Sequence, residues 1–346
     1  MRRWPGILRA YSDFYPSLDS VITLNEGNTP LVSLNHSVQH LFGKLEGQNP
    51  TGSFKDRGMT YAVTDAVHKG AHGVICASTG NTSASAAAYA ARAGLQCAVL
   101  IPDHAIASGK LSQALAFGAD VIPIEGNFDD ALRLVREYCD LHGEWQLVNS
   151  VNPVRLAGQK SASLEIIEQL DGKAPDVVVM PVGNAGNISA YYQGFVEAAK
   201  VWGSSMPRLI GVQAEGAAPL ATGKPFPQPE TLATAIRIGN PASRHLATQA
   251  VEQSAGRFVA VSDAAILKAQ QELAMTQGLF VEPASAAPYA ALPGLLADGT
   301  IHEHEVVVCI FTGNGLKDPG IVSRYAQVGS SIQPTSADLT KRLRVR

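Results

Sequence analysis

The stretch Asn49-Pro50-Thr51-Gly52-Ser53-Phe54-Lys55-Asp56-Arg57-Gly58 is the segment from which the rest of the chain can be interpreted. Its proline and glycine predict a turn. Ser53 then predicts the N-cap of a helix, because apolar residues follow it at helical spacing, namely Met59, Ala62, Val63, Ala66 and Val67. The pattern therefore places Lys55 in the first turn of a helix, directly after a loop.

A lysine is unusual at that position, because the helix dipole disfavours a cation at the N-terminus. The same dipole lowers the pKa of an amine and leaves it nucleophilic. The alternative interpretation is a solvated surface lysine, which is the more common case for a lysine taken alone. The loops described below decide between the two.

The composition is that of a well-packed protein. Of the 346 residues, 46 % are apolar and 16 % charged, and a net charge of −3 makes neither nucleic acid nor an anionic membrane an expected partner. No apolar run has membrane length, and the N-terminus lacks the apolar core of a signal peptide. The cysteines are scattered along the chain, at Cys76, Cys97, Cys139 and Cys309. Because they lack the spacing of metal ligands, we expect reduced thiols, no metal site and a cytoplasmic location.

Short apolar strands alternate with helices between an irregular arm over residues 1–20 and a polar tail after about residue 332. This alternation predicts parallel sheets covered by helices on both faces, and its division near residue 150 predicts two α/β domains. The first run contains predicted strands at 73–77, 96–101, 121–124 and 147–148 and helices at 83–93, 109–117 and 127–141. The second contains helices at 153–170, 188–202, 263–277 and from about 285, and strands at 177–180, 209–213, 258–261 and 306–311. Caps mark several of the helix ends, namely Gly94, Asn127, Asn152 and Ser262.

The unusual loops all follow strands, so we expect them to meet at the carboxyl ends of the sheets, where open α/β folds bind ligands. The loop Ser78-Thr79-Gly80-Asn81-Thr82-Ser83 puts hydroxyls, an amide and free backbone N–H groups at a helix N-terminus. This arrangement suits a carboxylate or a phosphate, although an ordinary capped helix start has the same composition.

A second loop, Pro181-Val182-Gly183-Asn184-Ala185-Gly186-Asn187, also joins a strand to a helix. Its small residues let backbone N–H groups close on an anion. The loop matches neither the dinucleotide fingerprint nor the P-loop, which favours a single phosphate such as that of a phosphorylated cofactor. A tight turn is the alternative.

Two further segments complete the pattern. Phe311-Thr312-Gly313-Asn314-Gly315-Leu316-Lys317-Asp318 follows the last strand, and the hydroxyl of Thr312 could meet a ring nitrogen without forcing its protonation. The segment 148–155 sets amides and Arg155 at the domain junction, and arginine suits a phosphate or carboxylate. The alternatives are a glycine turn for the first segment and a surface ion pair for Arg155.

Taken together, these segments resemble the threonine synthases, which are fold-type II (β-family) pyridoxal-phosphate enzymes with a tryptophan synthase β-like architecture. The resemblance runs in unbroken order over residues 25–325 and is carried by 44–46, 49–58, 78–83, 149–160, 183–187 and 312–318. It implies an enzyme that converts O-phospho-L-homoserine and water into L-threonine and phosphate, the last step of threonine biosynthesis.

The resemblance also implies roles for individual residues. Lys55 would form the Schiff base with pyridoxal 5'-phosphate, Asn81 would bond the ring hydroxyl of the cofactor, and Thr312 would bond its pyridine nitrogen. The cofactor phosphate would be held by Gly183, Asn184, Ala185, Gly186 and Asn187.

The resemblance assigns the substrate to the first loop and the domain junction. The substrate carboxylate would be clamped by Ser78, Thr79, Asn81 and Thr82. Asn149 and Arg155 would approach the substrate phosphate, to which Lys110 is an alternative cation unless it is simply solvated. The larger, cofactor-phosphate domain would comprise residues 1–52 and 150–346, and the smaller, substrate-carboxylate domain residues 53–149. A homodimer is expected from the same resemblance.

The nearest alternative is a threonine or serine dehydratase of the same fold. Those enzymes share a Ser-x-Lys segment, but their phosphate loop is almost wholly glycine, whereas this chain has Gly-Asn-Ala-Gly-Asn at 183–187. A non-catalytic binding protein that kept the fold would be expected to lack Lys55 or Asn81, and both are present. Glu282 begins a predicted helix and could face the cofactor, but a first-turn glutamate needs no such role.

Overall fold

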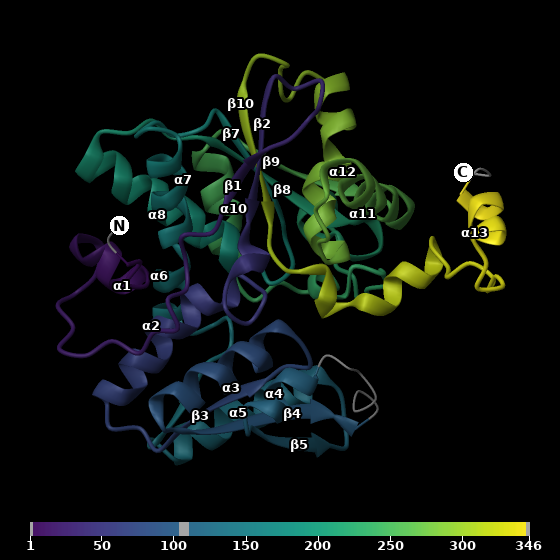
Figure 1. Ribbon diagram of the computed structural model, residues 1–346. Helices are drawn as coiled ribbons and strands as arrows, with labels where there is room; N and C mark the ends of the chain where they lie inside the picture. The colour runs from purple at the N-terminus through teal and green to yellow at the C-terminus, as the bar shows by residue number, and fades with distance from the viewer. Residues whose placement is uncertain (1–2, 104–110, 344–346) are drawn as a thin grey trace.

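In the computed structural model, which describes residues 3–103 and 111–343, the strands form two separate sheets (Figure 1). The larger sheet has the order β1-β2-β10-β7-β8-β9, and only the β1–β2 pair in it is antiparallel. Its strands are β1 (Leu31–Ser33), β2 (His40–Leu45), β7 (Val177–Pro181), β8 (Arg208–Ala214), β9 (Arg257–Val261) and β10 (Val306–Phe311).

The smaller sheet has the order β5-β4-β3-β6 and is parallel throughout. Its strands are β3 (Gly73–Ala77), β4 (Gln96–Pro102), β5 (Asp120–Ile124) and β6 (Trp145–Leu147). In Figure 1 this sheet and its helices form the lower layer, beneath the larger sheet. The two sheets agree with the prediction of mostly parallel sheets with helical cover.

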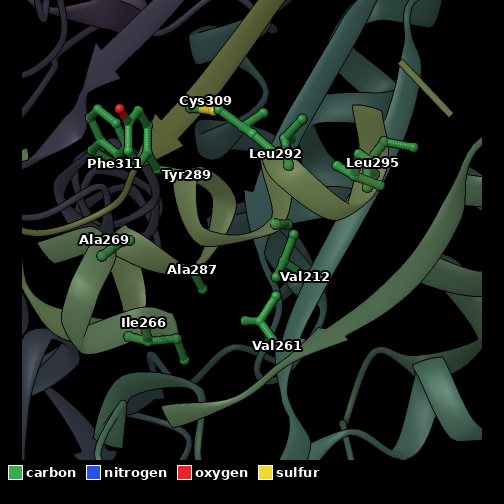
Figure 2. Packing of buried hydrophobic residues seen from close by; sticks show 14 of the residues in the cluster. Val212, Val261, Ile266, Ala269, Ala287, Tyr289, Leu292, Leu295, Cys309 and Phe311 are labelled. Atoms are coloured by element: carbon green, nitrogen blue, oxygen red, sulfur yellow. The ribbon is translucent and has the colours of Figure 1, made fainter. Parts of the chain in front are cut away.

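Helices cover both faces of the larger sheet, which explains why its central strands are apolar at consecutive positions. Val177 and Val179 of β7 face α11 (Asp263–Gln277) and α12 (Pro283–Ala297), where Cys309 and Phe311 also pack (Figure 2). Val178 belongs to the opposite core, which contains α1 (Ile7–Ala10), α7 (Ser161–Gln169), α8 (Gly186–Trp202) and α10 (Arg244–Gln253).

The smaller sheet is covered in the same way. One of its faces packs against α2 (Lys55–His68), α3 (Asn81–Ala93) and α4 (Ser112–Ala116). The other face packs against α5 (Phe128–Leu141) through Ala131 and Val135. The remaining α-helices are α6 (Pro153–Gln159), α9 (Pro219–Thr222) and α13 (Ser336–Leu343), and α13 lies apart from the body at the right of Figure 1.

Helices α2 and α6 cross where the two layers meet. A Cβ on Gly158 would lie 2.3 Å from the carbonyl oxygen of Arg57, and a Cβ on Gly58 would lie 2.7 Å from that of Arg155. Only glycine permits this approach, because backbone atoms cannot move aside as a flexible side chain can. The crossing therefore fixes the start of α2, and Lys55 with it, against the helix that carries Arg155.

Several predicted helix ends are confirmed. Gly94 ends α3 in the left-handed conformation, Asn127 forms a capping box with Asp130, and Ser262 caps α11. Asn152 caps α6 by accepting hydrogen bonds from two backbone N–H groups, ahead of Pro153.

Other sequence predictions need correction. Ser53 is not the N-cap of α2, since Phe54 holds that position and Ser53 forms an isolated bridge with Gly313. The helix predicted over 153–170 is interrupted at Lys160 and becomes α6 and α7. The arm predicted to be irregular contains α1, whose Ile7 is fully buried. The helix predicted from residue 109 is described only from residue 112, and residues 104–110 lie outside the description.

Within residues 3–103 and 111–343, no helix has the length and apolarity that crossing a membrane requires. In the same residues, no three His, Cys, Asp or Glu side chains are grouped as a metal site. All four cysteines are free, and Cys76, Cys97 and Cys309 are buried.

Candidate active site

A cleft of about 1290 Å³ opens at the carboxyl ends of the two sheets. Most residues predicted from the sequence line it, and they come from both layers of the fold: Lys55, Ser78, Thr79, Asn81, Thr82, Asn149, Gly183, Asn184, Ala185, Gly186, Asn187 and Thr312. Arg155 does not line it, and Lys110 lies outside the described residues. Loops that are far apart in the sequence therefore meet in one place, as their positions after strands predict.

Lys55 is the first residue of α2, and its Nζ lies 4.1 Å from the centre of the Phe54 ring. The pKa of Lys55 is lowered to about 7, mainly by burial and also by the positive charge of Arg155, while the charge of Glu282 acts in the opposite direction. A substantial part of the amine is therefore neutral near pH 7, which is the form that attacks an aldehyde or takes up a proton.

The loop 183–187 leads into α8, whose N-terminus has no side-chain cap. Ala185 holds the N-cap position in the left-handed conformation, with φ = +66°. Both polar side-chain atoms of Asn187 are buried and have no hydrogen-bond partner among the described residues. Free backbone N–H groups, the positive end of the helix dipole and an unsatisfied amide all favour a bound phosphate group.

Asn184 forms hydrogen bonds with a neighbouring loop. Its carbonyl oxygen accepts a hydrogen bond from the backbone of Ser243 at 3.1 Å, and its Oδ1 accepts one from Ala242 at 3.4 Å. The residue therefore ties the loop 183–187 to the segment before α10.

Thr312 follows β10 and is 4 % exposed. Its hydroxyl lies 2.9 Å from that of Ser285, and Ser285 also accepts a hydrogen bond from the backbone N–H of Gly313 at 2.8 Å. The hydroxyl group at the end of the last strand is therefore neutral and held in position, which suits an acceptor or donor nitrogen of a ring.

Glu282 is a cleft residue whose role the sequence left open. It is 5 % exposed and immediately precedes α12, and Asn81 donates from Nδ2 to both carboxylate oxygens at 3.2 Å. A Cβ on Gly313 would lie 2.3 Å from Oε1, so the carboxylate occupies its present position because residue 313 has no side chain. The contact joins the start of α3 in the smaller layer to the start of α12 in the larger one.

The loop 78–82 also begins a helix without a side-chain cap, because Gly80 occupies the N-cap position of α3. Ser78 accepts a hydrogen bond from the Gly80 N–H at 3.2 Å, and Ser83 donates to the Gly80 carbonyl at 2.7 Å. Ser78, Thr79 and Thr82 stay partly exposed in the cleft. Their hydroxyl groups and the helix N-terminus can receive a carboxylate.

Asn149 and Arg155 differ from the other predicted residues. The Asn149 amide bonds both the N–H and the carbonyl of Ala77, at 3.0 and 2.9 Å, and so fixes the end of β3. Arg155 is fully buried and donates from Nη1 to the Val148 carbonyl at 2.6 Å. Its Nε and Nη2 have no hydrogen-bond partner within residues 3–103 and 111–343. Arg155 therefore does not form the surface ion pair that its sequence context suggested.

The chain matches a family model described as pyridoxal-phosphate dependent enzyme over residues 22–313. It is 56 % identical over 325 residues to the threonine synthase of Mycobacterium bovis, an alignment that covers 91 % of this chain and 89 % of that protein. The threonine synthase of Methanocaldococcus jannaschii is 47 % identical over 94 % of this chain and 84 % of its own length.

The chain belongs to the threonine synthase family. It is a pyridoxal-phosphate dependent lyase, and its fold is that of the fold-type II enzymes. Cysteine synthase from Entamoeba histolytica has the same fold, with a TM-score of 0.74 at 22 % identity over 96 % of this chain and 94 % of that one. The residues of the cleft fit the cofactor, because Asn187 and the uncapped α8 offer unused donors to its phosphate and Lys55 offers an amine that burial keeps partly neutral.

Proposed function

We propose that this threonine synthase family member converts O-phospho-L-homoserine and water into L-threonine and phosphate, the last step of threonine biosynthesis. The observation that carries the proposal is one cleft in which Lys55 meets the uncapped Gly/Asn loop of α8, in a chain 56 % identical to a threonine synthase.

We propose that Lys55 carries the cofactor through Nζ. The loop 183–187 would hold the cofactor phosphate, Asn81 would bond the ring hydroxyl and Thr312 the ring nitrogen. The hydroxyl pair formed by Thr312 and Ser285 supports the last assignment, since it fixes a neutral group at the end of β10. When bound, pyridoxal phosphate withdraws electrons from the substrate carbon that loses a proton.

The chain's own groups would orient the substrate and move its protons. Ser78, Thr79, Asn81 and Thr82 would hold the substrate carboxylate at the start of α3, as the hydroxyl groups and free N–H groups there allow. The freed Nζ of Lys55 would take the proton from the α-carbon, a role that suits an amine whose pKa lies near 7. Positive charge must balance the departing phosphate, and the unused donors of Arg155, together with Asn149, would supply this contact.

An assay with O-phospho-L-homoserine tests the proposal. The purified holoenzyme is expected to release phosphate and threonine in equal amounts. Formation of 2-oxobutanoate from threonine as the main activity, without phosphate release from the ester, would contradict the proposal and identify a dehydratase.

The lowered pKa of Lys55 predicts how the reactivity of its amine depends on pH in the protein freed of cofactor. The amine is neutral above its pKa, so its acylation by a brief pulse of acetic anhydride should rise as the pH rises through 7 and level off above about 8. An ordinary lysine keeps gaining reactivity until about pH 10. Mass spectrometry of the peptide that contains Lys55 measures the profile, and a midpoint near 10 would show that burial does not shift the pKa of this amine.

We further propose that the enzyme acts as a cytoplasmic homodimer with domains 1–52 plus 150–346 and 53–149. The domain division is supported by the sheets, because all strands of the smaller sheet fall within 53–149. Light scattering should then give twice the chain mass of 36.4 kDa.

A further inference from the structure

A second lysine reaches into the cleft from the turn after β10. Lys317 ends the short 3-10 helix η7 (Gly315–Lys317) and lines the cleft. Its Nζ donates a hydrogen bond to Oε1 of Gln113, which belongs to α4 in the smaller layer. Lys317 thus joins the two layers across the cleft.

The turn that carries Lys317 is held tightly to the loop that carries Lys55. The backbone N–H of Asn314 donates a hydrogen bond to the Gly52 carbonyl at 2.9 Å. On its other side the turn is held by the N–H of Gly315, which donates to the backbone carbonyl of Phe280 at 3.0 Å. Gly52 has φ = +87°, and a Cβ placed on it would lie 3.5 Å from Cε of Lys317. The lysine stem therefore lies over the turn that precedes Lys55.

The ammonium group of Lys317 is in an unusual environment. Lys317 is partly buried. Two more deeply buried lysines form ion pairs, Lys44 with Glu165 at 2.8 Å and Lys160 with Glu197 at 2.6 Å. Within residues 3–103 and 111–343, no carboxylate lies within ion-pair distance of Lys317, and its hydrogen-bond partner is a neutral amide. Burial accordingly lowers the pKa of Lys317, which the charges of Asp56 and Glu282 offset in part.

A cation that is partly buried and lacks an anionic partner is less favourable than a paired one, and an anion that binds beside it removes that cost. Lys317 and Lys55 line the same cleft, and the charge of Glu282 acts on both amines. The inference drawn from this arrangement rests on the proposed function, because that function supplies the anion.

We propose that Lys317 is a specificity-determining residue that binds the phosphate group of the substrate, with Gln113 holding its ammonium group when no anion is present. The group recognised is a phosphate dianion attached to an amino acid. Lys317 would act from the wall of the cleft, whereas Arg155 is fully buried and does not line the cleft. An amino acid of similar size that lacks the phosphate group would gain no binding affinity from Lys317.

Two substitutions separate the charge of Lys317 from its bridging contact. Lys317→Gln keeps a donor for Gln113 but has no charge, and Gln113→Ala removes the bridge but keeps the charge. We expect Lys317→Gln to raise both the KM for O-phospho-L-homoserine and the dissociation constant of inorganic phosphate by about 10- to 100-fold, the range of a charge-assisted hydrogen bond. Gln113→Ala should change both constants far less, and Lys317→Arg should recover most of the lost affinity.

Calorimetric titration of the holoenzyme with inorganic phosphate measures this second anion site directly, since the cofactor already fills the first. L-2-Aminobutyrate, which has the amino acid head and no phosphate, is the control ligand, and its affinity should be the same in Lys317→Gln as in the wild type. Unchanged phosphate affinity in Lys317→Gln would overturn the inference, and so would equal losses in Lys317→Gln and Gln113→Ala. If the wild type binds phosphate through Lys317 but does not turn over O-phospho-L-homoserine, the proposed function fails while the anion site stands.

Discussion

Replacing Lys55 with alanine is expected to lower the rate of threonine formation by at least about a thousandfold, because it removes the amine that acts as the nucleophile. Lys55 begins α2 and lines the cleft, whereas Arg155 is fully buried and does not line it, and Lys317 bonds Gln113. Borohydride reduction of the wild type should attach the cofactor covalently to the peptide that contains Lys55, as mass spectrometry detects. Lys55→Ala should show no such mass increase.

Lys69→Ala is the matched control for this variant. It makes the same truncation at the other end of α2, where Lys69 is 55 % exposed and pairs with Asp65 at 2.7 Å. Activity and cofactor attachment should both match the wild type. Lys55→Arg keeps the positive charge but cannot make the covalent link, so it should be as inactive as Lys55→Ala. Substantial turnover by either Lys55 variant would rule out the assigned role.

Local sequence patterns predicted the elements and most of the cleft. The reason is that alternating apolar strands and helices leave few arrangements, and parallel strands bring the loops after them to one edge. The loops 78–82 and 183–187 were placed by this argument, and both begin uncapped helices in the cleft.

What local patterns could not predict depends on contacts across the chain. Ser53 has the composition of an N-cap, but a bridge with Gly313, 260 residues away, holds it outside the helix. Arg155 has the sequence context of a surface residue, yet α6 is packed so closely at Gly158 that the side chain is fully buried. Glu282 could be assigned to the cleft only once Asn81, from the other layer, was found beside it.

The start of α2 is also held by a group of buried charges that no sequence pattern reveals. The Arg57 guanidinium bonds both oxygens of Glu46, at 2.6 and 2.7 Å, and both oxygens of Glu165, each at 2.7 Å. Lys44 completes the group with a 2.8 Å contact to Glu165, so two cations balance two carboxylates. Burial alone would raise the pKa of Glu165, but Arg57 and Lys44 hold it at about 2.

Replacing Arg57 with methionine is expected to lower the free energy of unfolding by about 3–5 kcal/mol, the usual cost of removing one partner from a buried ionic group. Methionine fills part of the space, so the loss reports mainly the two carboxylates left with Lys44 alone. Urea denaturation at pH 7 measures the difference. Lys69→Ala again serves as the control, because an exposed pair on the same helix contributes about 1 kcal/mol or less.

The pH dependence of this loss identifies its electrostatic origin. In the wild type, the pKa of Glu165 is depressed to about 2, so its contribution to stability is complete above the unfolded value of 4.5 and is lost as the pH falls towards 2. Without Arg57 that contribution shrinks, because only Lys44 still stabilises the Glu165 carboxylate, and the difference in stability between wild type and Arg57→Met should be largest above pH 4.5 and should narrow in acid. A difference that stays constant from pH 7 to pH 3 would instead mean that Arg57 stabilises α2 by packing, since the packing of an uncharged surface does not respond to protonation.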